Sequence, residues 1–130
     1  EIQFSGPLTG AQFPDTWLSV LYALLEGAGD VLGIRRDDLD GTLNYLPGSP
    51  IPTLMLFDDV PGGAGHVKRV ANFLPEVIGA AHDRVNRDCC GPETSCTECL
   101  RNYRNQFHHE RLRRGLARDF LARLMSAFGL

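Results

Sequence analysis

The sequence predicts an α+β fold, in which four to five helices flank a small sheet of two or more strands next to a cysteine-rich loop. Apolar side chains recur at helical spacing over several segments, whereas only two short runs have the composition of strands. All four cysteines fall within residues 89–99. The 130 residues are 43% hydrophobic and 22% charged, which is ordinary for a soluble globular protein, so we expect a single domain over residues 1–130.

The first helix is predicted over residues 15–33. Asp15 or Thr16 is suited to cap its start, and its apolar side chains lie on one face at helical spacing. Gly27 and Gly29 weaken a helix, so we expect another segment to approach it closely there. The apolar positions of this helix are Val20, Leu21, Leu24, Leu25, Ala28, Val31 and Leu32.

Two strands are predicted next, at residues 42–46 and 53–57, after a charged turn over residues 34–41. A connection rich in proline and glycine, residues 47–52, separates them. The second strand is apolar on both faces, so we expect it to be the more buried of the two.

Helices make up the rest of the predicted fold. A glycine-rich turn at residues 61–65 leads into a helix with apolar side chains up to Leu74, and Pro75 is suited to begin the next helix. Three further segments are predicted: a cysteine-bearing loop over residues 88–99, a short helix over residues 97–106 and the most strongly amphipathic helix over residues 110–128.

Charge is distributed unevenly along the chain. Residues 1–60 contain nine acidic and two basic side chains, whereas residues 61–130 contain eleven basic and seven acidic ones, for a net charge of −3. No apolar run approaches the roughly 18 residues of a membrane span, so we expect no membrane partner. Because the chain begins with Glu1 and not with Met, we expect it to be an excised piece of a longer protein.

The cysteines follow the pattern C-C-x5-C-x2-C, at Cys89, Cys90, Cys96 and Cys99. Disulfides inside so short a loop would constrain little, whereas the spacing of Cys96 and Cys99 is that of a metal-binding turn. Four soft thiolate ligands favour Zn²⁺ in a tetrahedral shell. Such a shell leaves no position for water, so the predicted zinc site is structural and not catalytic.

Other interpretations of the cysteines stay open at this point. They are a redox C-x-x-C pair, an iron–sulfur cluster, and free thiols or disulfides. The adjacent Cys89 and Cys90 can both bind one ion only if the backbone bends between them. If one of the two cannot reach the ion, the fourth ligand is predicted among His82, Asp88, His108 and His109. Four thiolates with one zinc carry two negative charges, which we expect Arg101 and Arg104 to offset.

The glycine-rich turn offers two interpretations. Exposed N–H groups at a helix start attract anions, and His66, Lys68 and Arg69 would add positive charge for a phosphate. The alternative, which we favour, is a tight strand-to-helix connection that needs positive φ angles. Asp58 and Asp59 precede this turn; a capped acidic turn is favoured over a metal site.

Between Arg101 and Arg118 there are six arginines and one acid, Glu110. They are suited to grip a phosphate backbone, with Tyr103 or Phe107 stacking on a base. They are equally suited to pair with the acidic first half of the chain. A solvated face with internal ion pairs is slightly favoured.

Four stretches together resemble the MZB family, the zinc-binding domain named after the DNA-repair helicase MrfA. The resemblance covers residues 17–125. It implies a C-terminal domain of superfamily 2 helicase-type proteins in DNA repair or phage defence, including a DISARM component, and zinc ligands at Cys89, Cys90, Cys96 and Cys99. In this chain the first two cysteines are contiguous, and Arg113 replaces a usual acid. The stretches are residues 21–28 running into 31–41, then 56–69, 89–106 and 109–114.

The leading hypothesis is therefore a cytoplasmic, zinc-stabilised accessory domain without turnover of its own, which completes the fold of its parent chain and positions DNA. The expected DNA contacts are Arg101, Arg104, Arg111 and Arg114, followed by His66, Lys68 and Arg69. A second hypothesis is an interaction module that docks a partner subunit through the arginine-rich C-terminal helices. A third is an enzyme with Asp58, Asp59 and His66 around a catalytic metal.

Overall fold

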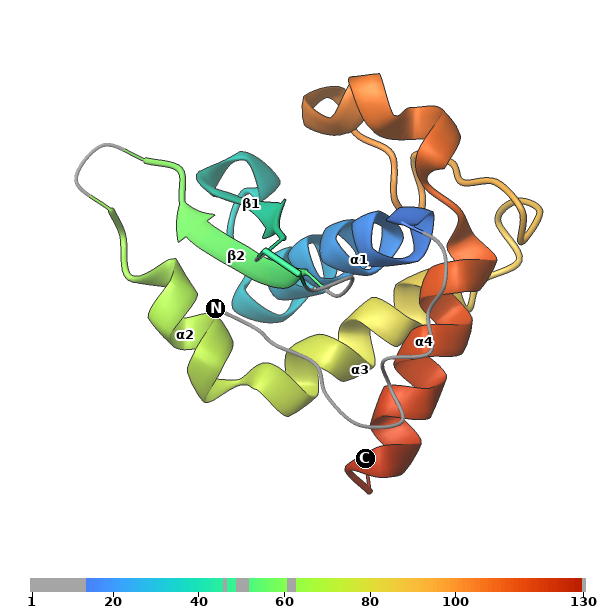
Figure 1. The fold of residues 1–130 in the computed structure, drawn as a ribbon. Coiled ribbons are helices and arrows are strands. Elements are labelled where there is room, and N and C mark those ends of the chain that lie inside the picture. Colours follow the sequence, from blue (N-terminus) through green and yellow to red (C-terminus); the bar gives the residue numbers. More distant parts are fainter. Residues whose placement is uncertain (1–13, 46, 49–51, 61–62, 130) are drawn as a thin grey trace.

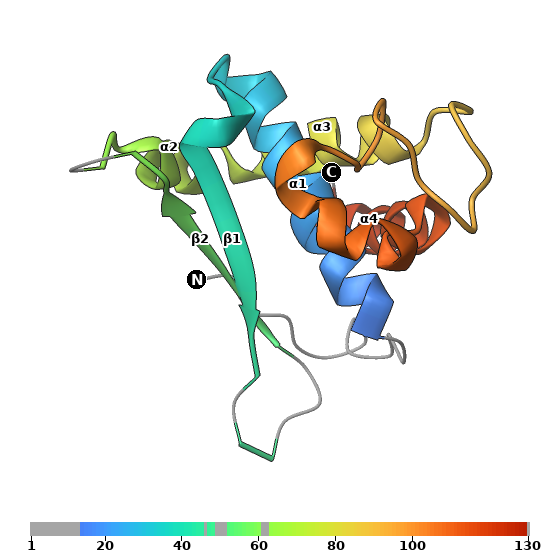
Figure 2. The same ribbon diagram turned by 90° about the horizontal axis from the view of Figure 1, so that it is seen from above.

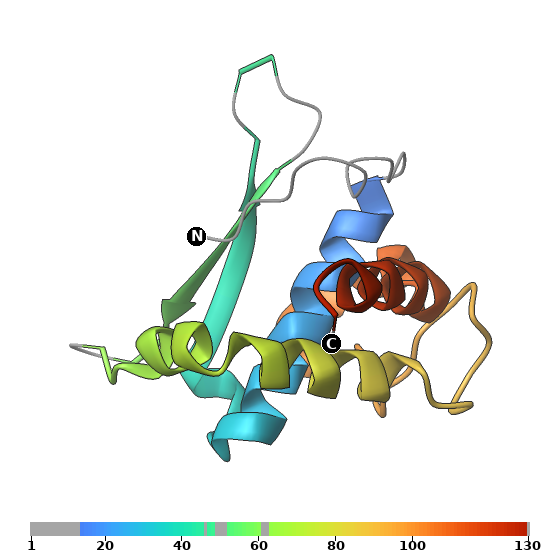
Figure 3. The ribbon, with the colours of Figure 1, turned by 90° about the horizontal axis from the view of Figure 1, so that it is seen from below.

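Helix α1 (Pro14–Leu32) lies at the centre of the molecule. The computed structural model describes residues 14–45, 47–48, 52–60 and 63–129 (Figure 1). A β-hairpin covers one side of α1, and helices α3 and α4 cover the other (Figures 2 and 3). The remaining elements are η2 (Arg36–Asp38), β1 (Leu39–Asn44), β2 (Thr53–Asp58), α2 (His66–Asn72), α3 (Leu74–Val85), η3 (Tyr103–Arg111) and α4 (Arg114–Ala127). The α+β prediction is confirmed.

The core is built around α1 because neighbouring elements cover its whole circumference. All residues from Thr16 to Leu25 are buried. Trp17 packs edge-on against Phe120 of α4, with ring centroids 5.2 Å apart. The helix begins one residue before the predicted start, so Asp15 lies in its first turn. Among the described helices, none is long and apolar enough to cross a membrane.

Gly27 marks the crossing of α1 and α3. A Cβ atom at this position would lie 2.7 Å from the Ala81 nitrogen and 2.8 Å from the Val77 oxygen, closer than real Cβ contacts come. The close approach predicted from the glycines is therefore confirmed at Gly27. At Gly29 the nearest such atom is the Ile34 oxygen at 3.8 Å, which is ordinary contact.

The two strands form an antiparallel hairpin, with a register that runs from Leu39 opposite Asp58 to Asn44 opposite Thr53. Strand β1 begins three residues before its predicted start, so the predicted turn over residues 34–41 is wrong in its last part. Strand β1 starts earlier because its first residues pair with β2, and the local sequence around residues 34–41 carries no information about this pairing. The expectation that the second strand is the more buried is confirmed, since β2 buries Thr53 and Leu54 and β1 buries Leu39 alone.

The connection from α2 to α3 follows the prediction to within one residue. Helix α3 begins at Leu74, with Pro75 in its first turn. Phe73, an apolar residue within the predicted helix that ends at Leu74, lies at the junction with 46% of its surface exposed.

The last third departs most from the prediction. The short helix predicted over residues 97–106 lies instead over Tyr103–Arg111, as a 3-10 helix with a kink at Asn105. Asn102 sets its start, because the Asn102 side chain accepts from the Arg104 and Asn105 nitrogens and the Asn105 side chain accepts from the Asn102 nitrogen.

Helix α4 begins four residues after the predicted start. Leu112 and Arg113 have extended backbones. The Arg113 nitrogen donates to Ser19 Oγ at 2.9 Å, and the Arg114 nitrogen donates to the Thr94 oxygen at 2.7 Å. These long-range bonds take the N–H groups into other parts of the fold and place the first turn of α4 against the cysteine loop.

Candidate metal centre

The four cysteines lie in a segment without helix or strand that joins α3 to η3 (Figure 1, yellow to orange). Their Sγ atoms all lie within 4.8 Å of one another. Both adjacent cysteines, Cys89 and Cys90, belong to this group. The backbone bend that contiguous ligands require is therefore present.

The sulfur positions fit zinc. Tetrahedral Zn–S bonds of about 2.3 Å place neighbouring sulfurs about 3.8 Å apart. The Cys90–Cys99 and Cys96–Cys99 sulfur pairs are each separated by 3.9 Å. Within the described residues, no histidine or carboxylate joins the group. His109, a predicted substitute ligand, is bonded through Nε2 to the Asn102 oxygen and Asn105 Oδ1, each at 2.9 Å.

A tight turn around Cys96 brings Cys99 back to it. The Cys96 carbonyl accepts from the nitrogens of Cys99, Leu100 and Arg101, at 3.3, 3.1 and 2.9 Å. The Cys96 nitrogen donates to Cys99 Sγ at 3.3 Å. This N–H···S bond stabilises negative charge on sulfur, as a thiolate ligand requires. The Arg101 nitrogen also returns to the Cys96 carbonyl instead of following the helical pattern, so the turn does not continue as the helix predicted from residue 97.

The thiols have perturbed pKa values with different physical causes. Burial, with a further contribution from the neighbouring sulfurs, raises the pKa of Cys99 to about 12. Burial also acts on Cys96, but the Glu98 N–H and the neighbouring thiols outweigh it and lower the pKa of Cys96. Cys99 is therefore protonated at neutral pH without a metal, and zinc must displace its proton to bind.

The four cysteines adjoin the apolar core, and Cys99 is the most deeply buried of them. Cys99 is 1% exposed, and the adjacent Leu100 is fully buried among the core residues. Cys89, Cys90 and Cys96 are half-buried and pack against the same core. An ion held by all four sulfurs would therefore fix the loop to the core at this edge.

Three arginine side chains donate hydrogen bonds to residues of the cysteine loop. Arg114 is only 2% exposed and donates to the Val85 oxygen at 3.0 Å and the Cys90 oxygen at 2.6 Å. Arg101 donates to Ser95 Oγ at 2.9 Å and to Thr94 Oγ1 and the His109 oxygen, each at 3.3 Å. Arg84, which sequence reasoning missed, donates to the Cys99 oxygen at 3.1 Å.

Other arginines of the second half pair with acids of the first half. Arg104 contacts Asp59 and Asp40. Arg111 contacts Asp15 at 2.9 Å, and Arg113 contacts the same carboxylate at 3.4 Å. The pairing of basic with acidic halves, which the sequence offered as an alternative to a solvated face, is therefore present at these three arginines. Of the four arginines expected to contact DNA, the structure thus places Arg101 and Arg114 at the cysteine loop and Arg104 and Arg111 in ion pairs.

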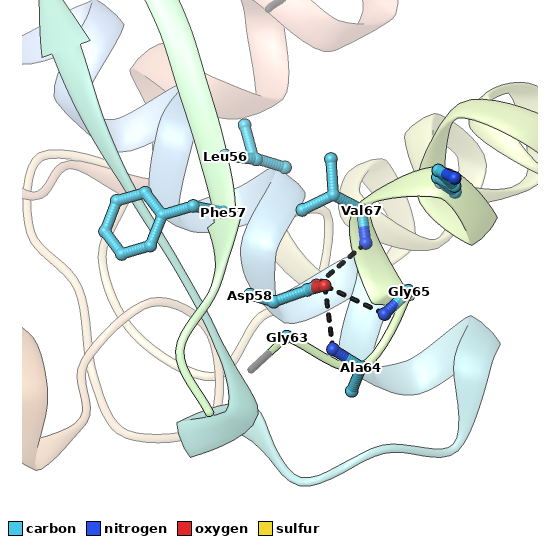
Figure 4. Close-up of a pocket in the computed structure, with 8 residues that line it drawn as sticks. Leu56, Phe57, Asp58, Gly63, Ala64, Gly65 and Val67 are labelled. Carbon is cyan, nitrogen blue, oxygen red and sulfur yellow. Dashed lines mark hydrogen bonds between the residues drawn. The ribbon is translucent and has the colours of Figure 1, made fainter. Parts of the chain in front are cut away.

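The glycine-rich turn already binds an anion, which is the carboxylate of Asp58. Asp58 accepts from the nitrogens of Ala64, Gly65 and Val67 at 3.1, 2.9 and 3.0 Å (Figure 4). Gly63 and Gly65 have φ angles of 72° and 75°, so the tight connection that we favoured is confirmed. Burial opposes ionisation of Asp58, but these three donors and His66 lower its pKa.

The basic residues predicted beside this turn lie on α2, at the opposite end of the molecule from the cysteine loop (Figures 1 and 3). Lys68 is exposed and borders an open hollow of about 540 Å³, and Arg69 donates to the Leu32 oxygen at 3.3 Å. The Nδ1 atom of His66 is buried without a partner among the described residues. Asp59 pairs with Arg104, so the structure does not assemble Asp58, Asp59 and His66 as a metal site.

The fold and the site define a small α+β domain with a four-cysteine cluster that fits zinc at the edge of its core. The chain belongs to the MZB family: the family model described as the MrfA Zn-binding domain matches residues 20–100. The matched range contains all four cysteines and ends before η3 and α4, the elements that pack against the cysteine loop.

One curated relative is the Druantia protein DruE of Escherichia coli strain UMEA 4076-1, which is 35% identical over 68 residues. The matched segment is 52% of this chain and 4% of DruE, so the chain spans only a small part of that relative's length. No solved structure matches the chain.

Proposed function

We propose that this chain is a zinc-stabilised, non-catalytic accessory domain of a larger helicase-type protein that acts in DNA repair or phage defence in the cytoplasm. Cys89, Cys90, Cys96 and Cys99 hold the ion. The observation that carries the proposal is the convergence of four sulfur atoms within 4.8 Å. Membership of a zinc-binding family and the small share of DruE that the chain covers support the role of a module in a longer chain.

The proposed role of the zinc is structural. Four thiolates fill a tetrahedral shell and leave no position for an activated water. The ion would link Cys89 and Cys90, which follow α3, to Cys96 and Cys99, which precede η3. The domain then offers its parent chain a loop of fixed shape and not a reactive centre.

Metal analysis of the purified chain tests the ligand set. We expect about one zinc per chain, and a loss of most of it in the Cys99→Ser variant because one thiolate is removed. Ser126→Ala, an exposed change in α4, is the matched control and retains the zinc. Full zinc content in a folded Cys99→Ser variant would contradict the assignment.

Contact with DNA, where the domain makes it, uses the cations left exposed by the fold. Lys68 forms no ion pair within the described part of the chain, and the side chain of Arg111 is 48% exposed. We expect Lys68→Gln and Arg111→Gln each to weaken binding similarly for all sequences and to flatten the salt dependence by about one unit. Fluorescence anisotropy against salt measures this. No binding of single- or double-stranded DNA at about 100 mM salt excludes this part of the proposal.

A second candidate function is docking to a partner protein, and the surface of η3 favours it. Tyr103 and Phe107 are 81% and 90% exposed, four positions apart. Aromatic side chains are enriched at protein interfaces and often dominate their energy. We expect Tyr103→Ser together with Phe107→Ser to abolish association with neighbouring domains of the parent while DNA affinity is unchanged. If the double variant instead weakens DNA binding and leaves the association with neighbouring domains unchanged, the two rings stack on bases.

A further inference from the structure

The three arginines around the cysteine loop differ in how their charges are balanced. Arg84 contacts the carboxylates of Glu26 at 3.5 Å and Asp30 at 3.0 Å, so acids of α1 neutralise it. Arg101 forms no ion pair within the described residues. Arg114 has only a contact of 4.0 Å with Asp88, whose side chain is fully exposed to solvent.

Arg114 is therefore a buried cation that has no carboxylate closer than 4.0 Å among the described residues. Its Nε atom also has no hydrogen-bond partner among the described residues. Burying a charge is costly unless an opposite charge balances it. The arrangement is explained if the opposite charge is supplied by something that binds next to Arg114.

The cysteine cluster supplies that charge when it holds zinc. Four thiolates and one divalent ion leave two negative charges, and the two arginines without close acidic partners carry two positive charges. Arg104, which the sequence suggested for this role, is already paired with Asp59 and Asp40. The balance therefore falls to Arg101 and Arg114.

Both arginines also fix the path of the loop. Arg114 joins the end of α3 to Cys90 through its side chain and holds Thr94 through its backbone nitrogen. Arg101 holds the hydroxyl groups of Thr94 and Ser95. These bonds form without the ion. We therefore expect the two arginines to hold the loop in the shape that brings the four cysteines together.

We propose that Arg101 and Arg114 are positioning and charge-balancing residues of the zinc centre, and not contacts for nucleic acid. The inference rests on the proposed binding of zinc by the four cysteines. Residues that support metal ligands from outside the coordination shell typically change metal affinity 10- to 100-fold. The affinity of the chain for zinc therefore depends on two cations that do not touch the ion.

Competition with a chromophoric chelator, on the full chain, measures this dependence. We expect Arg114→Met and Arg101→Met each to lower zinc affinity about tenfold or more. Arg114→Lys and Arg101→Lys retain the charge and bind more tightly than the methionine variants, although lysine does not reproduce the paired bonds of arginine. Arg118→Met, which removes a partly exposed arginine of α4 paired with Asp119, is the control and binds zinc like the wild type.

Three results would overturn the inference. They are wild-type zinc affinity in folded methionine variants, equal losses for lysine and methionine, and weaker DNA binding at unchanged zinc affinity. If Arg114→Met does not fold, the two Arg101 variants decide. Full zinc content in a folded Cys99→Ser variant removes the proposed ligand set itself, whereas zinc loss there with unaffected arginine variants removes only this inference.

Discussion

The core around α1 and the cysteine loop are stabilised by different physical means. In the core, Trp17, Leu25 and Phe120 are almost completely buried among other apolar side chains. The loop between α3 and η3 has no helix or strand. Its shape depends on backbone hydrogen bonds to the Cys96 carbonyl, on the N–H···S bond between Cys96 and Cys99, and on hydrogen bonds from arginine side chains.

This difference indicates that apolar burial stabilises the fold of the chain, whereas zinc binding acts on the cysteine loop. A domain of about 130 residues buries enough surface to fold without a metal, and α1, α3 and α4 supply that surface here. The loop buries little apolar side-chain area of its own apart from Cys99 and Leu100. We therefore expect zinc to order one edge of the domain and the core to fold without it.

The largest effect is expected in the core, from Phe120→Ala. This change removes a ring that is fully buried against Trp17 and leaves a cavity, so we expect the free energy of unfolding to fall by about 3–5 kcal/mol. Chemical denaturation measures it. Phe128→Ala is the control, because Phe128 is 68% exposed. A comparable loss in both variants would mean that burial does not distinguish them.

A smaller effect is expected where the core meets the loop, from Gly115→Ala. A Cβ atom there would lie 2.7 Å from the Pro92 oxygen, so α4 and the loop must move apart. We expect a loss of about 1–3 kcal/mol, together with weaker zinc binding. Gly79→Ala is the control, since a Cβ atom there meets nothing within 4 Å. Unchanged zinc affinity in Gly115→Ala would show that zinc binding by the loop does not depend on its packing against α4.

The smallest effect is expected far from the zinc, from Asp58→Asn. The pKa of Asp58 is lowered in the folded chain, so the carboxylate stabilises the fold above its ordinary pKa of about 3.9, and this contribution disappears as the pH falls through the lowered value. We expect the variant to be less stable by about 1 kcal/mol at pH 7. Thermal unfolding should show this difference in stability shrinking as the pH is lowered from 7 into the acidic range. A constant difference across this range would contradict the account.

Local patterns predicted α1, the two strands, the restart of α3 and the cysteine cluster, because each depends on residues close together in the sequence. They did not predict where β1 begins, which pairing with β2 decides. The partners of the arginines were also out of reach, since Arg111 and Asp15 are separated by 96 positions. Only the fold reveals that Arg114 points inward, although its spacing on a basic helix resembles that of an exposed arginine.

Hydrogen exchange of the wild-type chain, with zinc and after its removal by a chelator, tests the central claim most directly. We expect residues 88–111 to lose protection when zinc is removed, while the backbone amides of α1 and α3 keep theirs, because apolar burial holds these helices. Loss of protection in α1 and α3 together with the loop would contradict the claim that zinc orders only one edge. Unchanged protection of the loop would contradict the claim that zinc orders it at all.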